Sequence, residues 1–180
     1  MKKARAGFTI VELLVVIAVI GILASITIVS YNRAQLNARD TAIKNAAAQT
    51  ADALQLWATR NNTTPDNTNI QGAANNGKGW VQTSKYTTTI EDVLVTSGYL
   101  PKDFSANLQS ATPDYATQTL KNRSILMFYN CGTTGKYAVY AALNDDDANK
   151  KAEQKAKADA ASCPTTTIFD TYRMNYVVIF

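Results

Sequence analysis

The residue in the most unusual chemical setting is Glu12, the single charged residue between Phe8 and Val29. A carboxylate within an apolar span costs about 2.5–3.5 kcal/mol on membrane-insertion scales. Two interpretations account for it: it pairs with a cation in the same apolar surroundings, or it sits near the membrane interface and reaches water. Histidine is absent from the chain, which excludes histidine triads, the common zinc sites and imidazole acid–base catalysis.

Two cysteines, Cys131 and Cys163, are the next candidates for chemistry, and the sequence has no others. In a domain outside the cytoplasm such a pair predicts a disulfide. Two free buried thiols are the alternative. A metal site built from two cysteines without histidine is disfavoured.

Three consecutive acids, Asp145, Asp146 and Asp147, are candidate calcium ligands. Their spacing is not that of an EF-hand, and consecutive carboxylates rarely face one ion, so a solvated turn is favoured. The sequence has no nucleophile elbow, no phosphate-binding loop and no dinucleotide glycine pattern. We therefore expect no enzyme, no cofactor and no metal.

The apolar segment that contains Glu12 predicts a membrane-spanning helix. From Phe8 to Val29 a helix rises about 33 Å, enough to cross a hydrocarbon core of about 30 Å. Lys2, Lys3 and Arg5 precede it and place the N-terminus on the cytoplasmic side. A secretory signal peptide, the alternative, would have a shorter apolar stretch and no acid at its start.

The net charge of +4 belongs mostly to this N-terminus, because three of the four charges come from the basic residues before Phe8. The nearly neutral remainder argues against a nucleic-acid-binding domain. An alanine-rich stretch carries two acids, Glu153 and Asp159, and four lysines: Lys150, Lys151, Lys155 and Lys157. They predict a short surface helix of mixed charge, with DNA as a weakly supported partner.

Beyond Ser30 the sequence turns polar but keeps a helical apolar stripe. The stripe consists of Leu36, Ile43, Ala47, Thr50, Leu54 and Trp57. No proline occurs before Pro65, so we expect one helix over about 8–60, nearly 80 Å long. Its first half would be apolar all round, and its second half would pack on a globular head.

The head is predicted to be a small antiparallel sheet against that helix, an α+β fold. Strands are expected at 124–130, 136–143 and 175–180, with a hairpin turn at 131–135 and a further possible strand at Thr165–Asp170. A short helix should start at a capping box formed by Thr89 and Asp92 and end at Gly98.

The pattern G-F-T-x-x-E-L-L, which follows a short basic leader and opens an apolar span, resembles the N-terminus of type IV pilins and pseudopilins. The resemblance implies that a prepilin peptidase cuts after Gly7, that Phe8 is then N-methylated, and that Glu12 is needed for ordered assembly. The implied division is a leader at 1–7, a membrane and polymerisation segment at 8–30, and a pilin head at 31–180.

Physical chemistry supports this resemblance. Cutting after Gly7 exposes an α-amine on Phe8 with a pKa near 8, and an ammonium and a carboxylate in apolar surroundings favour pairing. Glu12 could pair with Phe8 of its own chain at i,i+4, or with the amine of a neighbouring subunit, which would fix the register of a helical bundle.

The resemblance implies a structural subunit of a type IV pilus that serves adhesion, twitching motility or DNA uptake. A pseudopilin of a secretion or competence system is the close alternative, and a non-polymerising membrane-anchored binding domain is the alternative of another class. The implied partners are copies of the chain, the prepilin peptidase, the assembly platform and minor pilins. The chain would be a single-pass inner-membrane protein with its head outside the cytoplasm, and an extracellular filament after assembly.

Overall fold

The computed structural model describes residues 9–65, 78–81, 89–104, 108, 113–114, 119–120 and 126–180. Its first element is one long helix, α1 (Ile10–Arg60), in agreement with the single helix expected from the sequence. The chain divides into two compact units whose boundary lies within α1, between Ala38 and Arg39. We describe the two units separately.

In the first unit, α1 is an apolar helix that no described element covers. Every side chain from Thr9 to Arg39 is exposed, and α1 contains an 18-residue window with a mean hydropathy of 2.9, none of which is buried. The hydroxyls of Ser25, Thr27 and Ser30 donate to main-chain carbonyls one turn earlier, at 2.7, 2.9 and 3.1 Å. Polar side chains satisfied within their own helix suit apolar surroundings.

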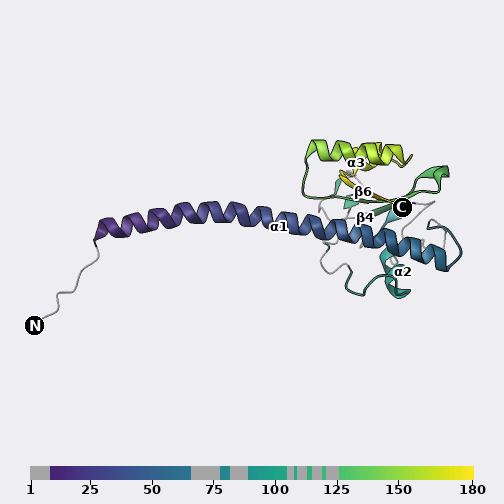
Figure 1. The fold of residues 1–180 in the computed structure, drawn as a ribbon, viewed down its shortest axis with the longest axis horizontal. Coiled ribbons are helices and arrows are strands. Elements are labelled where there is room, and N and C mark those ends of the chain that lie inside the picture. Colours follow the sequence, from purple (N-terminus) through teal and green to yellow (C-terminus); the bar gives the residue numbers. More distant parts are fainter. Residues whose placement is uncertain are drawn as a thin grey trace, which may run out of the picture. The chain divides into compact units, whose positions relative to one another are not determined.

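The second unit is built on a four-stranded antiparallel sheet with the strand order β1-β4-β5-β6 (Figure 1). The strands are β1 (Lys78–Trp80), β4 (Leu126–Asn130), β5 (Tyr137–Ala141) and β6 (Tyr176–Ile179). The three expected strands are therefore confirmed with shorter bounds. A tight turn, η2 (Gly132–Thr134), joins β4 to β5 and ends at Gly135, whose φ of 68° favours glycine. A separate ribbon pairs β2 (Pro113–Asp114) with β3 (Thr119–Leu120).

One face of the sheet packs on the second half of α1. Strand alternation directs Leu126, Phe128 and Val139 to this face, where they join the helical stripe. Ile43, Ala47, Thr50, Leu54 and Trp57 are all buried, which confirms the predicted stripe from residue 43 onward. Leu36 was wrongly included in the stripe, because it lies in the first unit and is 45% exposed.

A short helix, α2 (Ile90–Thr96), closes one side of this core with Ile90 and Leu94. It begins at the predicted capping box, in which the Thr89 hydroxyl accepts from the Asp92 amide and the Asp92 carboxylate accepts from the Thr89 amide. Gly98 follows its last turn with a φ of 76°, as expected for a helix stop.

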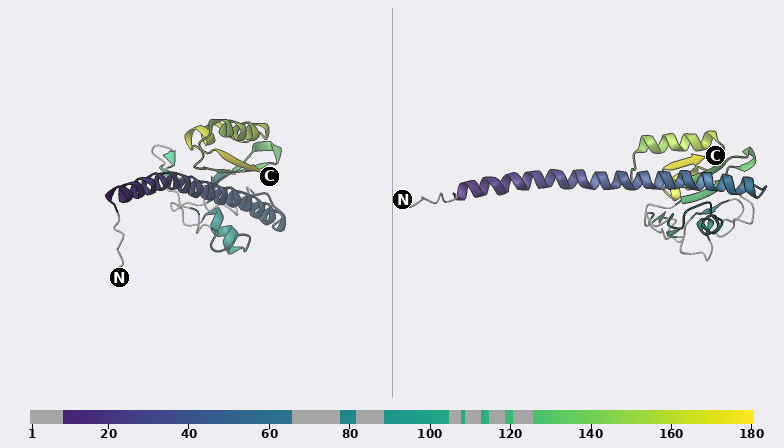
Figure 2. Two further views of the ribbon diagram at one scale, coloured as in Figure 1. Left: turned by 60° about the vertical axis from the view of Figure 1, so that its left-hand side comes forward. Right: turned by 60° about the horizontal axis from the view of Figure 1, so that its bottom comes forward.

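The opposite face of the sheet is covered by α3 (Ala148–Ala160) and by a helical turn with π-type hydrogen bonds, η3 (Thr166–Thr171). Figures 1 and 2 show the sheet between α3 and the second half of α1. The mixed-charge helix is confirmed, and it also covers a core that includes Tyr140, Ala158 and Val177. The possible strand at Thr165–Asp170 was wrong. Ile168 and Phe169 are both fully buried, whereas a strand would point successive side chains to opposite faces.

Cys131 and Cys163 form a disulfide, the pairing favoured by the sequence. Cys131 directly follows β4, and Cys163 lies between α3 and η3. Both belong to the core on the α3 side of the sheet. The bond therefore ties the β4–β5 hairpin to the layer that covers this face.

Candidate functional site

The N-terminus of α1 holds Glu12 in a capping box with Thr9. The Glu12 Oε2 atom accepts from the Thr9 amide at 2.9 Å and from the Thr9 hydroxyl at 2.7 Å. In return, the Glu12 amide donates to the Thr9 hydroxyl at 3.3 Å. A threonine at the N-cap and an acid at the third helical position satisfy each other's main-chain donors in this way. A carboxylate near a helix N-terminus also interacts favourably with the helix dipole.

In this geometry only one of the two carboxylate oxygens of Glu12 accepts hydrogen bonds from Thr9. Both bonds from Thr9 go to Oε2, and Oε1 has no hydrogen bond to any residue that the structure describes. One carboxylate oxygen therefore closes the helix end, and the other remains able to accept from a cation. Gly7 and Phe8, the predicted processing residues, lie outside the described residues, so cleavage, methylation and the pairing of the Phe8 amine stay predictions.

The part played by Thr9 was missed by the sequence interpretation, although its signal was present. Thr9 and Glu12 have the same spacing as Thr89 and Asp92, for which a capping box was predicted.

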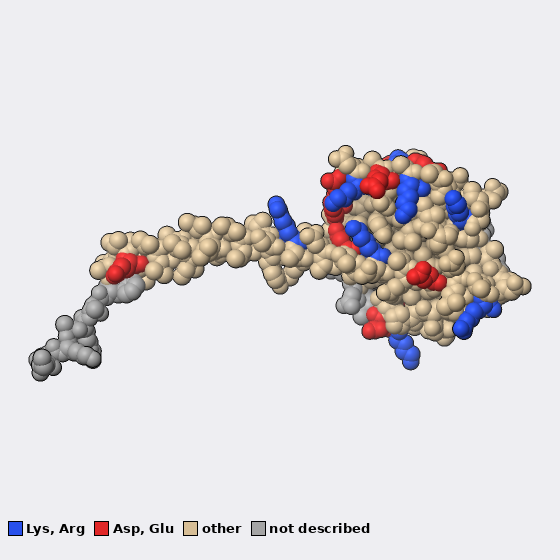
Figure 3. Space-filling model, in the orientation of Figure 1, with Lys and Arg blue, Asp and Glu red and all other residues tan. Residues whose placement is uncertain are grey.

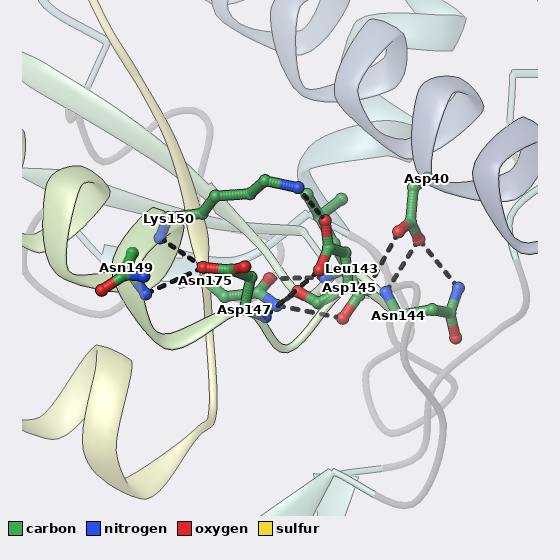
Figure 4. Close-up of polar contacts among 8 residues, drawn as sticks. All are labelled: Asp40, Leu143, Asn144, Asp145, Asp147, Asn149, Lys150 and Asn175. Carbon is green, nitrogen blue, oxygen red and sulfur yellow. Dashed lines mark hydrogen bonds and ion pairs between the residues drawn. The ribbon is translucent and has the colours of Figure 1, made fainter.

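A second polar cluster, in the second unit, fixes the loop between β5 and α3 (Figure 4). Asp40, on α1, is buried, with 6% of its surface exposed. Its carboxylate accepts from the Asn144 amide at 2.8 Å, the Asn144 side-chain amide at 2.9 Å and the Asp145 amide at 3.0 Å. Three donors compensate for the burial of this carboxylate.

The same loop is held from its other side by Asn175, just before β6. The Asn175 Oδ1 accepts from the Leu143 amide at 2.7 Å, and its Nδ2 donates to the carbonyls of Leu143 and Asp145 at 3.1 and 2.7 Å. Asn175 is 5% exposed. Buried, fully bonded amides of this kind fix one loop conformation.

Within this loop, the candidate calcium ligands have protein partners. The Lys150 ammonium donates to Asp145 at 2.6 Å, while Asp147 caps α3 by accepting from the amides of Asn149 and Lys150. The hydrogen bond from Lys150, followed by that from the Asp147 amide, lowers the pKa of Asp145. The same contact raises the pKa of Lys150. Among the described residues, no three aspartate, glutamate, histidine or cysteine side chains lie close enough together to hold a metal ion. The three consecutive aspartates therefore do not form a calcium site in this structure.

Asp40 was not identified from the sequence. It falls on the helical stripe between Leu36 and Ile43, at spacings of four and three. A single acid on an otherwise apolar stripe is the signal that could have found it, because such an acid must be matched by donors from the element it faces.

The α3 lysines are mostly engaged within the head. Lys155 pairs with Asp170 at 3.0 Å, and Lys157 donates to the Val177 carbonyl at 3.3 Å. Together with the Lys150–Asp145 pair, these contacts show that three of the four lysine ammonium groups bind acceptors within the head. On the face shown in Figure 3, the first unit is largely free of charged side chains, and the second carries both signs. This distribution adds no support for a DNA-binding surface.

Comparison with known proteins identifies the N-terminus. Residues 2–28 match the family model described as the prokaryotic N-terminal methylation motif, the hallmark of type IV pilins and pseudopilins. The match covers residues 2–7 of the predicted leader, Glu12 and most of the apolar part of α1. No solved structure is significantly similar to the chain.

Proposed function

We propose that this chain is a structural, non-catalytic subunit of a type IV pilus, held in the membrane by its N-terminal helix and polymerised through it. The observation that carries the proposal is the first unit: an apolar helix, exposed along its whole length, with one carboxylate at its start, inside a matched methylation motif. The α+β head fits the pilin-like layout.

The apolar helix supports both a membrane-bound and an assembled state. As a precursor, the chain would use the apolar part of α1, whose most apolar 18-residue window has the length and hydropathy of a membrane span. In a filament, the same side chains would be buried against the helices of neighbouring copies. Because lipid tails and apolar side chains are similar surroundings, the transfer between the two states needs packing and polar contacts rather than a hydrophobic driving force.

Glu12 supplies the polar contact. Leader removal by a prepilin peptidase would expose the Phe8 amine and remove Lys2, Lys3 and Arg5, which hold the helix at the cytoplasmic face. The α-amine of a neighbouring subunit would then bind Oε1 of Glu12, the oxygen that Thr9 leaves free. One such pair per subunit would fix the axial register of the helices.

Two alternatives share part of this account. A pseudopilin of a secretion or competence system would use the same helix and the same processing, and would differ in forming no surface filament. A non-polymerising anchor would gain only the helix cap from Glu12, while the acid raises the cost of insertion. The assembly platform and minor pilins are partners that follow from the proposal.

The proposal is tested by replacing Glu12 with glutamine or leucine. Glu12→Gln keeps the shape and the acceptor toward Thr9 but removes the charge, and Glu12→Leu removes both. We expect normal expression, insertion and leader cleavage for each variant, because neither change touches the leader or reduces apolarity. Surface filaments should fall at least about tenfold, the loss that a contact of about 1.4 kcal/mol would produce.

Immunoblots of sheared surface material and of membranes measure these two pools separately. Glu91→Gln, at an acid in α2 of the head, serves as the matched control and should assemble normally. Filaments of Glu12→Leu protein at wild-type abundance, in cells without a wild-type copy, would contradict the charge-register mechanism.

A further inference from the structure

The C-terminal end of α1 carries two overlapping copies of the Asn-x-Thr pattern, the acceptor sequence for N-linked glycans on surface loops of secreted proteins. One copy is Asn61-Asn62-Thr63, and the other is Asn62-Thr63-Thr64. A serine version of the acceptor sequence, Asn122-Arg123-Ser124, lies outside the described residues. The structure distinguishes between the first two.

The Asn61 copy is engaged by the helix end. Its side-chain amide nitrogen, the atom that would carry a glycan, donates to the Trp57 carbonyl at 2.8 Å. Its partner Thr63 is half-buried, and the Thr63 amide donates to the Ala58 carbonyl at 3.0 Å. Both ends of this acceptor pattern are therefore held by the last turn of α1.

The Asn62 copy is presented outward. Asn62 and Thr64 are both exposed, and neither side chain makes a hydrogen bond to any residue that the structure describes. The backbone of Asn62 has a φ of 49°, which turns the chain away from the helix. The Asn62 amide donates to the Thr59 carbonyl at 3.3 Å, so the turn itself is fixed while the side chain remains accessible.

The helix stop explains part of this sequence. The bonds from the amides of Asn62 and Thr63 back to Thr59 and Ala58 form a Schellman motif, in which glycine or asparagine is preferred at the left-handed position. A helix stop does not require a threonine two residues later, nor its exposure. The acceptor pattern requires both.

We propose that Asn62 is an N-glycosylation site of the head, used in preference to Asn61. The co-substrate would be an oligosaccharide on a lipid pyrophosphate carrier, transferred by a membrane oligosaccharyltransferase. The side-chain amide nitrogen of Asn62 forms a bond to C1 of the first sugar, and the C1–oxygen bond to the pyrophosphate breaks. The lipid pyrophosphate leaves with the electron pair of that bond, and the proton lost from the side-chain amide balances the charge of this leaving group. The proposal depends on the location of the head outside the cytoplasm and does not depend on polymerisation.

The test uses the full chain purified from the cells that make it. Trypsin cuts after Arg60 and Lys78 and places both copies on one peptide, residues 61–78. Electron-transfer fragmentation then assigns any added hexose or N-acetylhexosamine mass to Asn61 or to Asn62. We expect the mass on Asn62.

Two pairs of variants separate the two copies. Asn62→Gly keeps the left-handed helix stop and removes the acceptor amide, and Thr64→Val keeps Asn62 but removes the hydroxyl that the pattern requires. Both should abolish the modification. Asn61→Gln and Thr63→Val remove the acceptor pattern of the first copy only, because the middle position of the second copy, Thr63, can be any residue except proline. Both should leave the modification of Asn62 in place.

An unmodified 61–78 peptide, or a glycan that persists in both Asn62→Gly and Thr64→Val, would overturn the proposal. Protease accessibility of the head in intact cells reports the location independently. An accessible head with an unmodified peptide would overturn the glycosylation site and leave the proposed function intact, whereas a protected, cytoplasmic head would contradict both.

Discussion

At the scale of single residues, Thr9 and Glu12 act as a unit. The carboxylate that the sequence marks as costly already has a partner in its own chain, through Oε2. Bonds within one helix turn lower the cost of placing an acid in apolar surroundings. Thr9 therefore both caps α1 and turns the Glu12 carboxylate toward the helix N-terminus, where an incoming α-amine would arrive.

Replacing Thr9 with valine should reduce filament assembly more than it reduces the stability of the folded protein. Valine keeps the shape of threonine and removes the hydroxyl, and loss of an N-cap costs about 1 kcal/mol. Glu12 then loses one donor and its fixed direction. We expect severalfold fewer sheared filaments by quantitative immunoblot, with unchanged leader cleavage by mass spectrometry.

Thr9→Ser is the conservative control, because serine is at least as good an N-cap as threonine, and it should restore assembly. Equal filament abundance in Thr9→Val and wild type would show that Thr9 does not position Glu12. A leader retained in Thr9→Val would instead show that Thr9 serves the peptidase.

At the scale of elements, the head depends on a small number of polar contacts that the sequence pattern did not predict. The strands follow from the alternation of apolar and polar residues, and the α2 capping box follows from the spacing of three between Thr89 and Asp92. The helical stripe follows from the period of about 3.6 residues. Asp40, Asn144 and Asn175 are brought together from α1, the β5–α3 loop and the start of β6. Contacts between residues so far apart in sequence have no local pattern that predicts them.

Replacing Asp40 with alanine should destabilise the head. The amides of Asn144 and Asp145 would lose their acceptor. A fully buried unsatisfied donor costs about 1–3 kcal/mol, and these part-buried donors should cost less because water reaches them. We expect a lower Tm by differential scanning fluorimetry, and faster hydrogen exchange in residues 143–147.

Asp52 provides the matched control, because it is an exposed acid on the same helix. Asp52→Ala should leave both the Tm and the exchange unchanged. A Tm of Asp40→Ala equal to that of wild type would show that the three bonds contribute nothing net to stability.

The disulfide should support the head alone. The double change of Cys131 and Cys163 to serine removes the bond without leaving a reactive thiol, and a bond that closes a loop of this length contributes about 3–4 kcal/mol in the chain-entropy model. We expect a lower Tm and faster proteolysis within 144–165, with normal membrane insertion.

Reduction of the wild-type chain with dithiothreitol should reproduce the lower Tm, and it serves as the independent comparison. Labelling of both cysteines by a thiol reagent in the unreduced native protein would mean that the bond does not form in the cell.

The errors of the sequence interpretation at this scale have one physical cause. Leu36 satisfies the helical period, but among the residues that the structure describes the side chains of α1 are buried only from Asp40 onward. Thr165–Asp170 has the composition of a strand, but its adjacent side chains Ile168 and Phe169 are both buried against the sheet. Composition and period report what a segment could bury, and the neighbouring elements decide where burial occurs.

At the scale of the whole molecule, the chain combines two units with different tasks. The first unit carries the matched motif and an uncovered apolar helix, and the second buries a core on each face of a sheet. The sequence predicted the apolar segment and the α+β class, because apolarity over 20 residues and strand alternation are strong local signals. It did not predict the second layer, since α3 buries little beyond alanine.

The central claim is that this chain leaves the membrane as a processed subunit of a surface filament. It is tested most directly by the intact mass of the chain in filaments sheared from the cells that make it. The account predicts a chain that begins at Phe8, carries one added methyl group on its N-terminal amine and retains the bond between Cys131 and Cys163. Filaments in which the chain keeps residues 1–7, or filaments from which it is absent while it remains uncleaved in the membrane, would contradict the account.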